Sequence, residues 1–119
     1  MTQSTVEVKI EKQDSVTIIS ILSPRIPADL SDSFEDHVVR TIHRLTEPKV
    51  LLDFAAVRFI SSSILGKLIK LNGRIVTDQR GQFKLCSLDD RIAEVFRITG
   101  LHTLFSIHPT REKALASFT

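Results

Sequence analysis

Three adjacent serines, Ser61, Ser62 and Ser63, are the side chains whose type and spacing best suit chemistry. They stand where an apolar segment changes into an amphipathic one, so Ser61 or Ser62 is expected at the N-cap of a helix. The free N–H groups and the dipole of a helix N-terminus favour an anion at such a place. Capping preferences alone explain a serine there, but three hydroxyls exceed what one cap needs. A surplus exposed hydroxyl could accept a phosphoryl group, which would change the charge of the surface.

The segments on both sides of the serines support this placement. The run from Val50 to Phe54 is short and nearly all apolar, which is typical of a strand covered on both faces of a sheet. After the serines, apolar residues recur at helical spacing, and this helix is expected to run to Thr77 or Arg80 before Gly81 stops it.

The rest of the chain alternates strands with helices. Val6, Val8 and Ile10 alternate with polar residues in a half-buried strand, which forms a hairpin with a strand over residues 16–22. Residues 23–28 contain two prolines and are expected to form an exposed loop. A helix is expected over residues 30–45, capped by Asp29 or Ser31. A strand around Phe83 and Leu85 follows later, and then a helix capped by Asp89 or Asp90 that ends near Gly100. A short strand is expected within residues 101–107, and the last helix starts at Pro109 and Thr110. The order β-β-α-β-α-β-α-β-α predicts one α/β domain over residues 1–119, in which about four helices cover a central sheet.

Composition and charge argue against several classes of protein. The 16 basic and 14 acidic residues are scattered, so the net charge of +2 does not indicate a nucleic-acid-binding surface. Cys86 is the only cysteine, which excludes an intramolecular disulfide, disfavours a cysteine-based zinc site and fits a reducing cytoplasm. Neither a signal peptide nor an apolar run of about 18 residues is found, so a cytoplasmic protein that does not span a membrane is expected.

The other polar side chains form no catalytic or metal-binding pattern. Asp53 ends an apolar strand, and a carboxylate there is expected to accept backbone N–H bonds from the following loop rather than to act as a catalytic acid. The four histidines lack the i, i+4 spacing of helical metal ligands, and no Gly-x-Ser-x-Gly motif is present. Cys86 is expected to be a buried small hydrophobe. We therefore expect no enzymatic activity, no metal site and no cofactor.

The residues around the serines resemble the STAS domains, and among these the small bacterial anti-sigma factor antagonists. An apolar strand that ends in Asp53, a short loop with Val57 and Phe59, and the run Ile60-Ser61-Ser62-Ser63-Ile64-Leu65-Gly66 are similar to that family's signature of strand, Asp or Asn, loop, Phe-(Met/Ile)-Asp-Ser-Ser-Gly-Leu-Gly, helix. Position by position, Ser62 falls on the phosphoacceptor serine, Ser63 on the second serine or threonine, Leu65 on the leucine and Gly66 on the second glycine. The chain departs from the signature at Ser61, where the family usually has Asp, and at Ile64, where it usually has the first Gly.

The resemblance implies a mechanism of partner switching. An unphosphorylated antagonist binds an anti-sigma factor, usually itself a serine kinase, and frees a sigma factor, and phosphorylation of the serine ends that binding. In this chain the resemblance implies that Ser62 is the switch, that Ser61, Ser63, Ile64 and Leu65 contact the partner, and that Asp53 and Gly66 support the site structurally. Ile64 is expected to enlarge the local surface. Residues 23–28 are a candidate rim of the contact surface.

Two other interpretations stay open. The chain could be a constitutive STAS scaffold or a ligand-binding module that uses the same surface without phosphorylation, and Ser61 in place of the usual acid supports that alternative. A serine phosphatase is a further candidate partner. A homodimer formed through the outer side of the first or last helix is also open, because periodicity does not separate core from interface.

Overall fold

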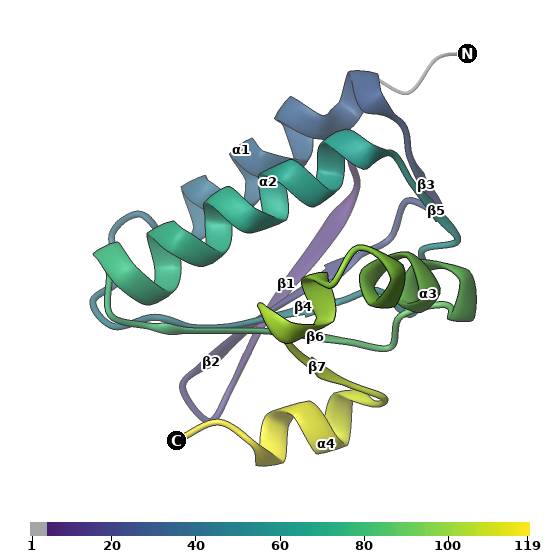
Figure 1. The fold of residues 1–119 in the computed structure, drawn as a ribbon. Helices are drawn as coiled ribbons and strands as arrows, with labels where there is room; N and C mark the ends of the chain where they lie inside the picture. Colours follow the sequence, from purple (N-terminus) through teal and green to yellow (C-terminus); the bar gives the residue numbers. More distant parts are fainter. Residues whose placement is uncertain (1–4) are drawn as a thin grey trace.

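A mixed five-stranded sheet forms the centre of the computed structural model, which describes residues 5–119 (Figure 1). Its strands are β1 (Val8–Gln13), β2 (Val16–Ile21), β4 (Lys49–Asp53), β6 (Gln82–Cys86) and β7 (Ser106–His108), in the order β1-β2-β4-β6-β7. β1 and β2 are antiparallel, and the other neighbours are parallel. The two turn residues between β1 and β2, Asp14 and Ser15, have φ values of 50° and 68°, as tight hairpins with the native strand twist require. The predicted hairpin and mixed sheet are confirmed.

Helices cover both faces of this sheet. α1 (Ser31–Ile42), α2 (Ser62–Asn72) and α3 (Asp90–Ile98) pack on one face, and the short α4 (Arg111–Ala116) packs on the other (Figure 1). α2 continues as a π-helical segment, η2 (Gly73–Asp78), so its predicted end is close to the observed one. Val50 and Leu52 of β4 point into the larger core beneath α1 to α3, while Leu51 joins the smaller core beneath α4. β4 is thus buried on both faces, and the predicted α/β architecture with four helices is confirmed for residues 5–119.

Residues 23–28 do not form the exposed loop that their prolines predict. They contain β3 (Arg25–Ile26), which pairs in parallel with β5 (Phe59–Ile60) to form a second, two-stranded sheet just before α2. The Pro24 carbonyl accepts the N–H groups of Arg58 and Phe59, and the Ser61 N–H donates to the Ile26 carbonyl at 3.0 Å. The loop prediction is wrong because segments this short carry no periodicity, and only their long-range pairing makes them strands.

Several element ends also differ from the predictions. Residues 101–107 begin as a 3-10 helix, η3 (Leu101–Thr103), so that the last strand covers only residues 106–108. α1 follows another 3-10 turn, η1 (Ala28–Leu30), and has no side-chain cap from Asp29 or Ser31. Ile10, which was expected on the buried side of its strand, is exposed on the edge strand β1. The predicted cap of α3 is confirmed, since Asp89 accepts the Arg91 N–H. The last helix, predicted to start at Pro109 and Thr110, begins at Arg111, and Thr110 caps it by accepting the Lys113 N–H.

Gly81 lies just beyond the α2–η2 segment, which ends at Asp78, and a glycine is needed there for a reason other than the predicted helix stop. A glycine that stops a helix usually adopts a left-handed backbone, but here it is Arg80 that has a positive φ of 54°. A side chain at Gly81 would instead collide with Pro48, which lies just before β4. The glycine is therefore required by a close approach of two backbones.

Candidate functional site

The serine turn joins β5 to α2. Ser61 takes the N-cap position, with an extended backbone (φ −79°, ψ 164°), and its carbonyl accepts the Ile64 N–H at 3.1 Å. Its hydroxyl makes no capping bond to the helix backbone. The Ser61 Oγ lies 2.7 Å from the Ser63 Oγ instead, so these two hydroxyls hydrogen-bond to each other. The predicted N-cap position is confirmed, whereas the expected side-chain cap is absent.

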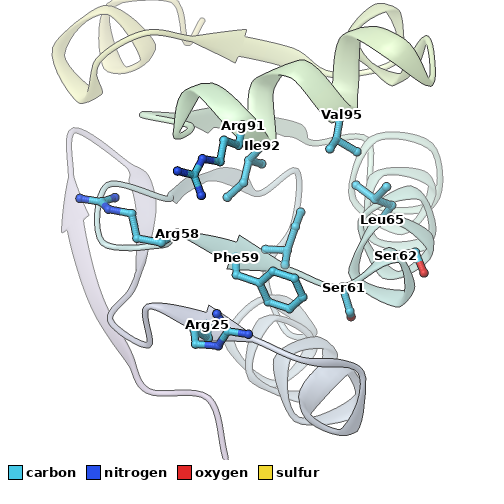
Figure 2. Close-up of a pocket in the computed structure, with 10 residues that line it drawn as sticks. Arg25, Arg58, Phe59, Ser61, Ser62, Leu65, Arg91, Ile92 and Val95 are labelled. Carbon is cyan, nitrogen blue, oxygen red and sulfur yellow. The ribbon is translucent and has the colours of Figure 1, made fainter.

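Ser62 is the first residue of α2, and its side chain is exposed. Among the residues that the structure describes, its hydroxyl has no hydrogen-bond partner. In Figure 2 the Ser62 oxygen points outward, away from the arginines on the other side of the neighbouring pocket. The N–H groups of Ser62 and Ser63 belong to the first helical turn, whose donors have no acceptor within the helix. A negative group on Ser62 would thus stand at the positive end of the helix dipole.

The residues that follow divide between the core and the surface. The Ile64 side chain is 0% exposed and packs in the core together with Leu68, one helical turn further on. The expectation that Ile64 enlarges the surface and contacts a partner is therefore wrong, because this position faces the sheet. Leu65 is partly buried and faces the pocket, whereas Gly66 is exposed with no atom near the place of a Cβ.

Asp53 lies at the C-terminal end of β4 and is only 5% exposed. As expected from the sequence, one of its oxygens accepts a backbone N–H of the following loop, that of Ala55, at 2.9 Å. The other oxygen accepts the Arg111 Nε–H at 2.8 Å. Arg111 also donates to the Ser20 hydroxyl at 2.7 Å and lies 3.3 Å from a Glu11 carboxylate oxygen. The hydrogen bond with Asp53 raises the pKa of Arg111 above its ordinary value, so the guanidinium stays charged.

The Asp53–Arg111 pair was not predictable from the sequence, because the two residues are 58 positions apart and no local pattern connects them. The bond between them joins the start of α4 to the C-terminal end of β4. The loop that leads to the serine turn begins at this end of β4. Asp53 therefore has a structural role near the site and does not line the pocket beside Ser62.

Replacing Asp53 by Ala is expected to lower the free energy of unfolding by about 3 kcal/mol, because the change leaves a partly buried guanidinium without its main partner. Chemical denaturation followed by circular dichroism measures this loss. Asp32→Ala is the matched control, since Asp32 also pairs with a cation, Lys67, at 2.9 Å but is 90% exposed. Its effect should be far smaller, because exposed ion pairs contribute little. Equal losses in the two variants would contradict the structural role assigned to Asp53.

A pocket of about 470 Å³ opens beside the serine turn, between β3, β5, α2 and α3 (Figure 2). It is lined by Arg25, Arg58, Phe59, Ile60, Ser61, Ser62, Leu65, Arg91, Ile92 and Val95. Residues 23–28 were a candidate rim of the contact surface, and Arg25 from that segment does reach the pocket. The contributions of Arg58, Arg91 and Val95 were missed, because they lie in segments that only the fold brings together.

The described part of the chain holds neither a metal-binding cluster nor an activated thiol. Within residues 5–119, no group of three or more His, Cys, Asp or Glu side chains could hold a metal ion. Cys86 is buried, and burial together with the charge of Asp53 raises the pKa of its thiol to about 11, so it is not a ready nucleophile. Helices long and apolar enough to cross a membrane are not found in the described part of the chain.

Comparison with known proteins identifies the family. Residues 7–114 match the STAS domain family. BtrV of Bordetella bronchiseptica, a protein named as an anti-sigma factor antagonist, is 33% identical over 72 residues, which cover 60% of this chain and 61% of BtrV. The match thus spans less than two thirds of that relative.

Solved structures show the same fold. An anti-sigma-factor antagonist (STAS) domain protein from Planctomyces limnophilus superposes with a TM-score of 0.84 at 26% identity, over 92% of this chain and 96% of that one. The Bacillus cell fate determinant SpoIIAA in its phosphorylated form has a TM-score of 0.67 at 16% identity, over 92% of this chain and 97% of that one. Anti-sigma factor antagonists of this kind are regulators and not enzymes, in agreement with the expectation from the sequence. The chain belongs to the STAS domain family, and it is similar to proteins named as anti-sigma factor antagonists.

Proposed function

We propose that this protein is a cytoplasmic anti-sigma factor antagonist that works by partner switching. Its unphosphorylated form binds an anti-sigma factor, itself a serine kinase, and releases a sigma factor, and phosphorylation of Ser62 ends the binding. The observation that carries the proposal is the state of the three hydroxyls. Those of Ser61 and Ser63 bond to each other, while that of Ser62 is exposed and unbonded at the first position of α2. Ser62 is thus the serine of the three whose hydroxyl is free to enter a kinase active site.

The electrostatics of the helix start explain how such a switch would act without refolding the protein. A phosphate brings a charge of about −1.5 to −2, and the N-terminus of α2 tolerates it because of the first-turn N–H groups and the dipole. The phosphate would then weaken binding by placing charge and bulk in an interface built around neutral hydroxyls. In this proposal the contact surface includes Ser61, Ser63 and Leu65, but not the buried Ile64. SpoIIAA, a protein of the same fold, has a phosphorylated form.

A second candidate function is a constitutive scaffold or ligand-binding module that uses the same surface. The observation in its favour is the pocket of about 470 Å³ beside the serines, which is large enough for a small ligand. Ser61 in place of the family's usual acid also favours this alternative, because the carboxylate next to the phosphoacceptor is missing.

The proposal is tested by affinity capture from the source cells, followed by phosphorylation of the purified proteins. The unmodified chain should capture a kinase-like anti-sigma factor. With ATP, that factor should then place one phosphate on this chain, which peptide mass spectrometry locates on Ser62. Ser62→Ala should abolish the modification, whereas Ser63→Ala, the neighbouring control, should retain it. Capture of no such kinase, or a phosphate on another residue, would favour the constitutive module.

A further inference from the structure

Three arginines face the pocket beside Ser62 without a carboxylate partner. Arg25, Arg58 and Arg91 line it, and within the described chain none of them lies within ion-pair distance of an acidic side chain. Arg97 and Arg111 elsewhere on the surface are both paired, with Glu94 and with Asp53. The residues that line the pocket include no Asp or Glu. An unbalanced cluster of this kind creates a positive local potential that attracts anions.

Two of these guanidinium groups are held in place by the fold. The Arg25 guanidinium stacks over the Phe59 ring at 4.5 Å from its centroid. Arg58 donates through Nη1 to the Ala55 carbonyl at 2.9 Å. These contacts use only part of the donor capacity of each guanidinium, which has five N–H groups and suits bidentate binding of carboxylates. Since the groups are already positioned, less side-chain entropy would be lost on binding.

The pocket has a basic end and an apolar end. Figure 2 shows the guanidinium groups of Arg58 and Arg91 on one side, and Leu65 and Val95 on the other, with the Phe59 ring between them. Phe59 and Val95 are exposed, at 38% and 40%. An occupant that satisfies both ends must therefore carry negative charge next to an apolar group.

We propose that this pocket receives an acidic and apolar segment of the anti-sigma factor. Carboxylates of the segment pair with Arg25, Arg58 and Arg91, and an adjacent apolar side chain packs between Leu65 and Val95. The identity of the partner rests on the proposed function, whereas the chemistry of the segment rests on the pocket itself. A protein segment is favoured over a small ligand because the pocket shares Ser61, Ser62 and Leu65 with the proposed contact surface. Charge at Ser62 would then repel the same segment that the arginines attract.

Peptide binding to the purified protein tests directly whether the pocket prefers a segment with acidic and apolar side chains. The probes are the blocked peptide acetyl-Gly-Glu-Leu-Glu-Leu-Gly-amide, a version with lysine in place of both glutamates, and a version with serine in place of both leucines. Backbone amide shifts measured by NMR should move at Arg25, Phe59, Leu65 and Arg91. The glutamate peptide should bind about tenfold more tightly than the lysine peptide, as two to three exposed charge pairs would give. The serine version should also bind more weakly. No shifts at these residues, or equal binding of the glutamate and lysine peptides, would overturn the proposal.

Arginine variants provide the matched comparison. Arg25→Gln and Arg91→Gln should each weaken binding of the glutamate peptide about threefold. Arg97→Gln is the control, because it removes the same charge from α3 outside the pocket, and it should leave the affinity unchanged. An equal effect of Arg91→Gln and Arg97→Gln would indicate general charge attraction and would overturn the proposal.

Binding experiments with the captured anti-sigma factor test the pocket proposal separately from the proposed function. If Ser62→Asp blocks its binding while Arg25→Gln and Arg91→Gln act no differently from Arg97→Gln, partner switching stands and the pocket proposal fails. If the peptide results are as expected but no anti-sigma factor is captured, the pocket stands as a site for acidic segments and the proposed function fails.

Discussion

Ser62→Asp is expected to weaken binding to the captured anti-sigma factor about 100-fold, a cost of roughly 2.7 kcal/mol. Ser62→Ala should change the affinity by less than about threefold, because an unpaired exposed hydroxyl contributes little. The difference arises because the aspartate places a charge in the proposed interface. The Ser62 oxygen points away from the pocket arginines, so they would not neutralise that charge (Figure 2). Isothermal titration calorimetry with the purified partner measures both affinities.

The control for this comparison is Ser15→Asp. Ser15 lies in the hairpin between β1 and β2, at the other end of the sheet from β3 and β5 (Figure 1). It is exposed, and its positive φ of 68° is one that aspartate adopts readily. This variant adds the same charge away from the site and should bind like the unmodified protein. The melting temperature of Ser62→Asp should not fall, because an acid in the first turn of a helix is favourable. Retained binding of Ser62→Asp, or lost binding of Ser62→Ala, would contradict the switch.

Gly81→Ala is expected to destabilise the protein by about 3 kcal/mol, at the upper end of what overpacking costs. A Cβ at this position would overlap the Pro48 carbonyl oxygen and stand 2.9 Å from Pro48 Cδ. That carbonyl also accepts the Gln82 N–H at 2.8 Å, where β6 begins to pair with β4. Relief of the clash would therefore disturb the start of the central parallel ladder. Urea denaturation measures the free energy of unfolding.

Gly66→Ala is the matched control for Gly81→Ala. Gly66 lies on the exposed face of α2, and no atom lies within 4 Å of the point that a Cβ would occupy there. The alanine should stabilise the protein by about 0.5–1 kcal/mol, because it restricts the unfolded chain and favours the helix. The two substitutions are thus expected to change the free energy of unfolding in opposite directions. A stable Gly81→Ala variant would show that the approach of Gly81 to Pro48 does not constrain the fold.

Local patterns in the sequence predicted most of the fold. The alternation in the hairpin, the apolar run of β4 and the helical spacing after the serines each arise within a few residues, so the corresponding elements were identified correctly. The same patterns located Ser61 at the N-cap of α2. Ile64 belongs to the apolar residues at helical spacing and does face the core, whereas the resemblance to the family motif suggested a surface position there.

The sequence by itself determined the kinds and order of the main elements and the place of the serines at a helix start, because hydrophobic periodicity and capping are local properties. Only the tertiary structure decided which distant residues meet. The pairing of β3 with β5, the bond between Asp53 and Arg111, and the convergence of Arg25, Arg58 and Arg91 on one pocket depend on how the chain crosses the sheet. Contacts between residues so far apart in the sequence do not affect local spacing. The pairing of β3 with β5 and the convergence of the three arginines nevertheless form the proposed partner surface.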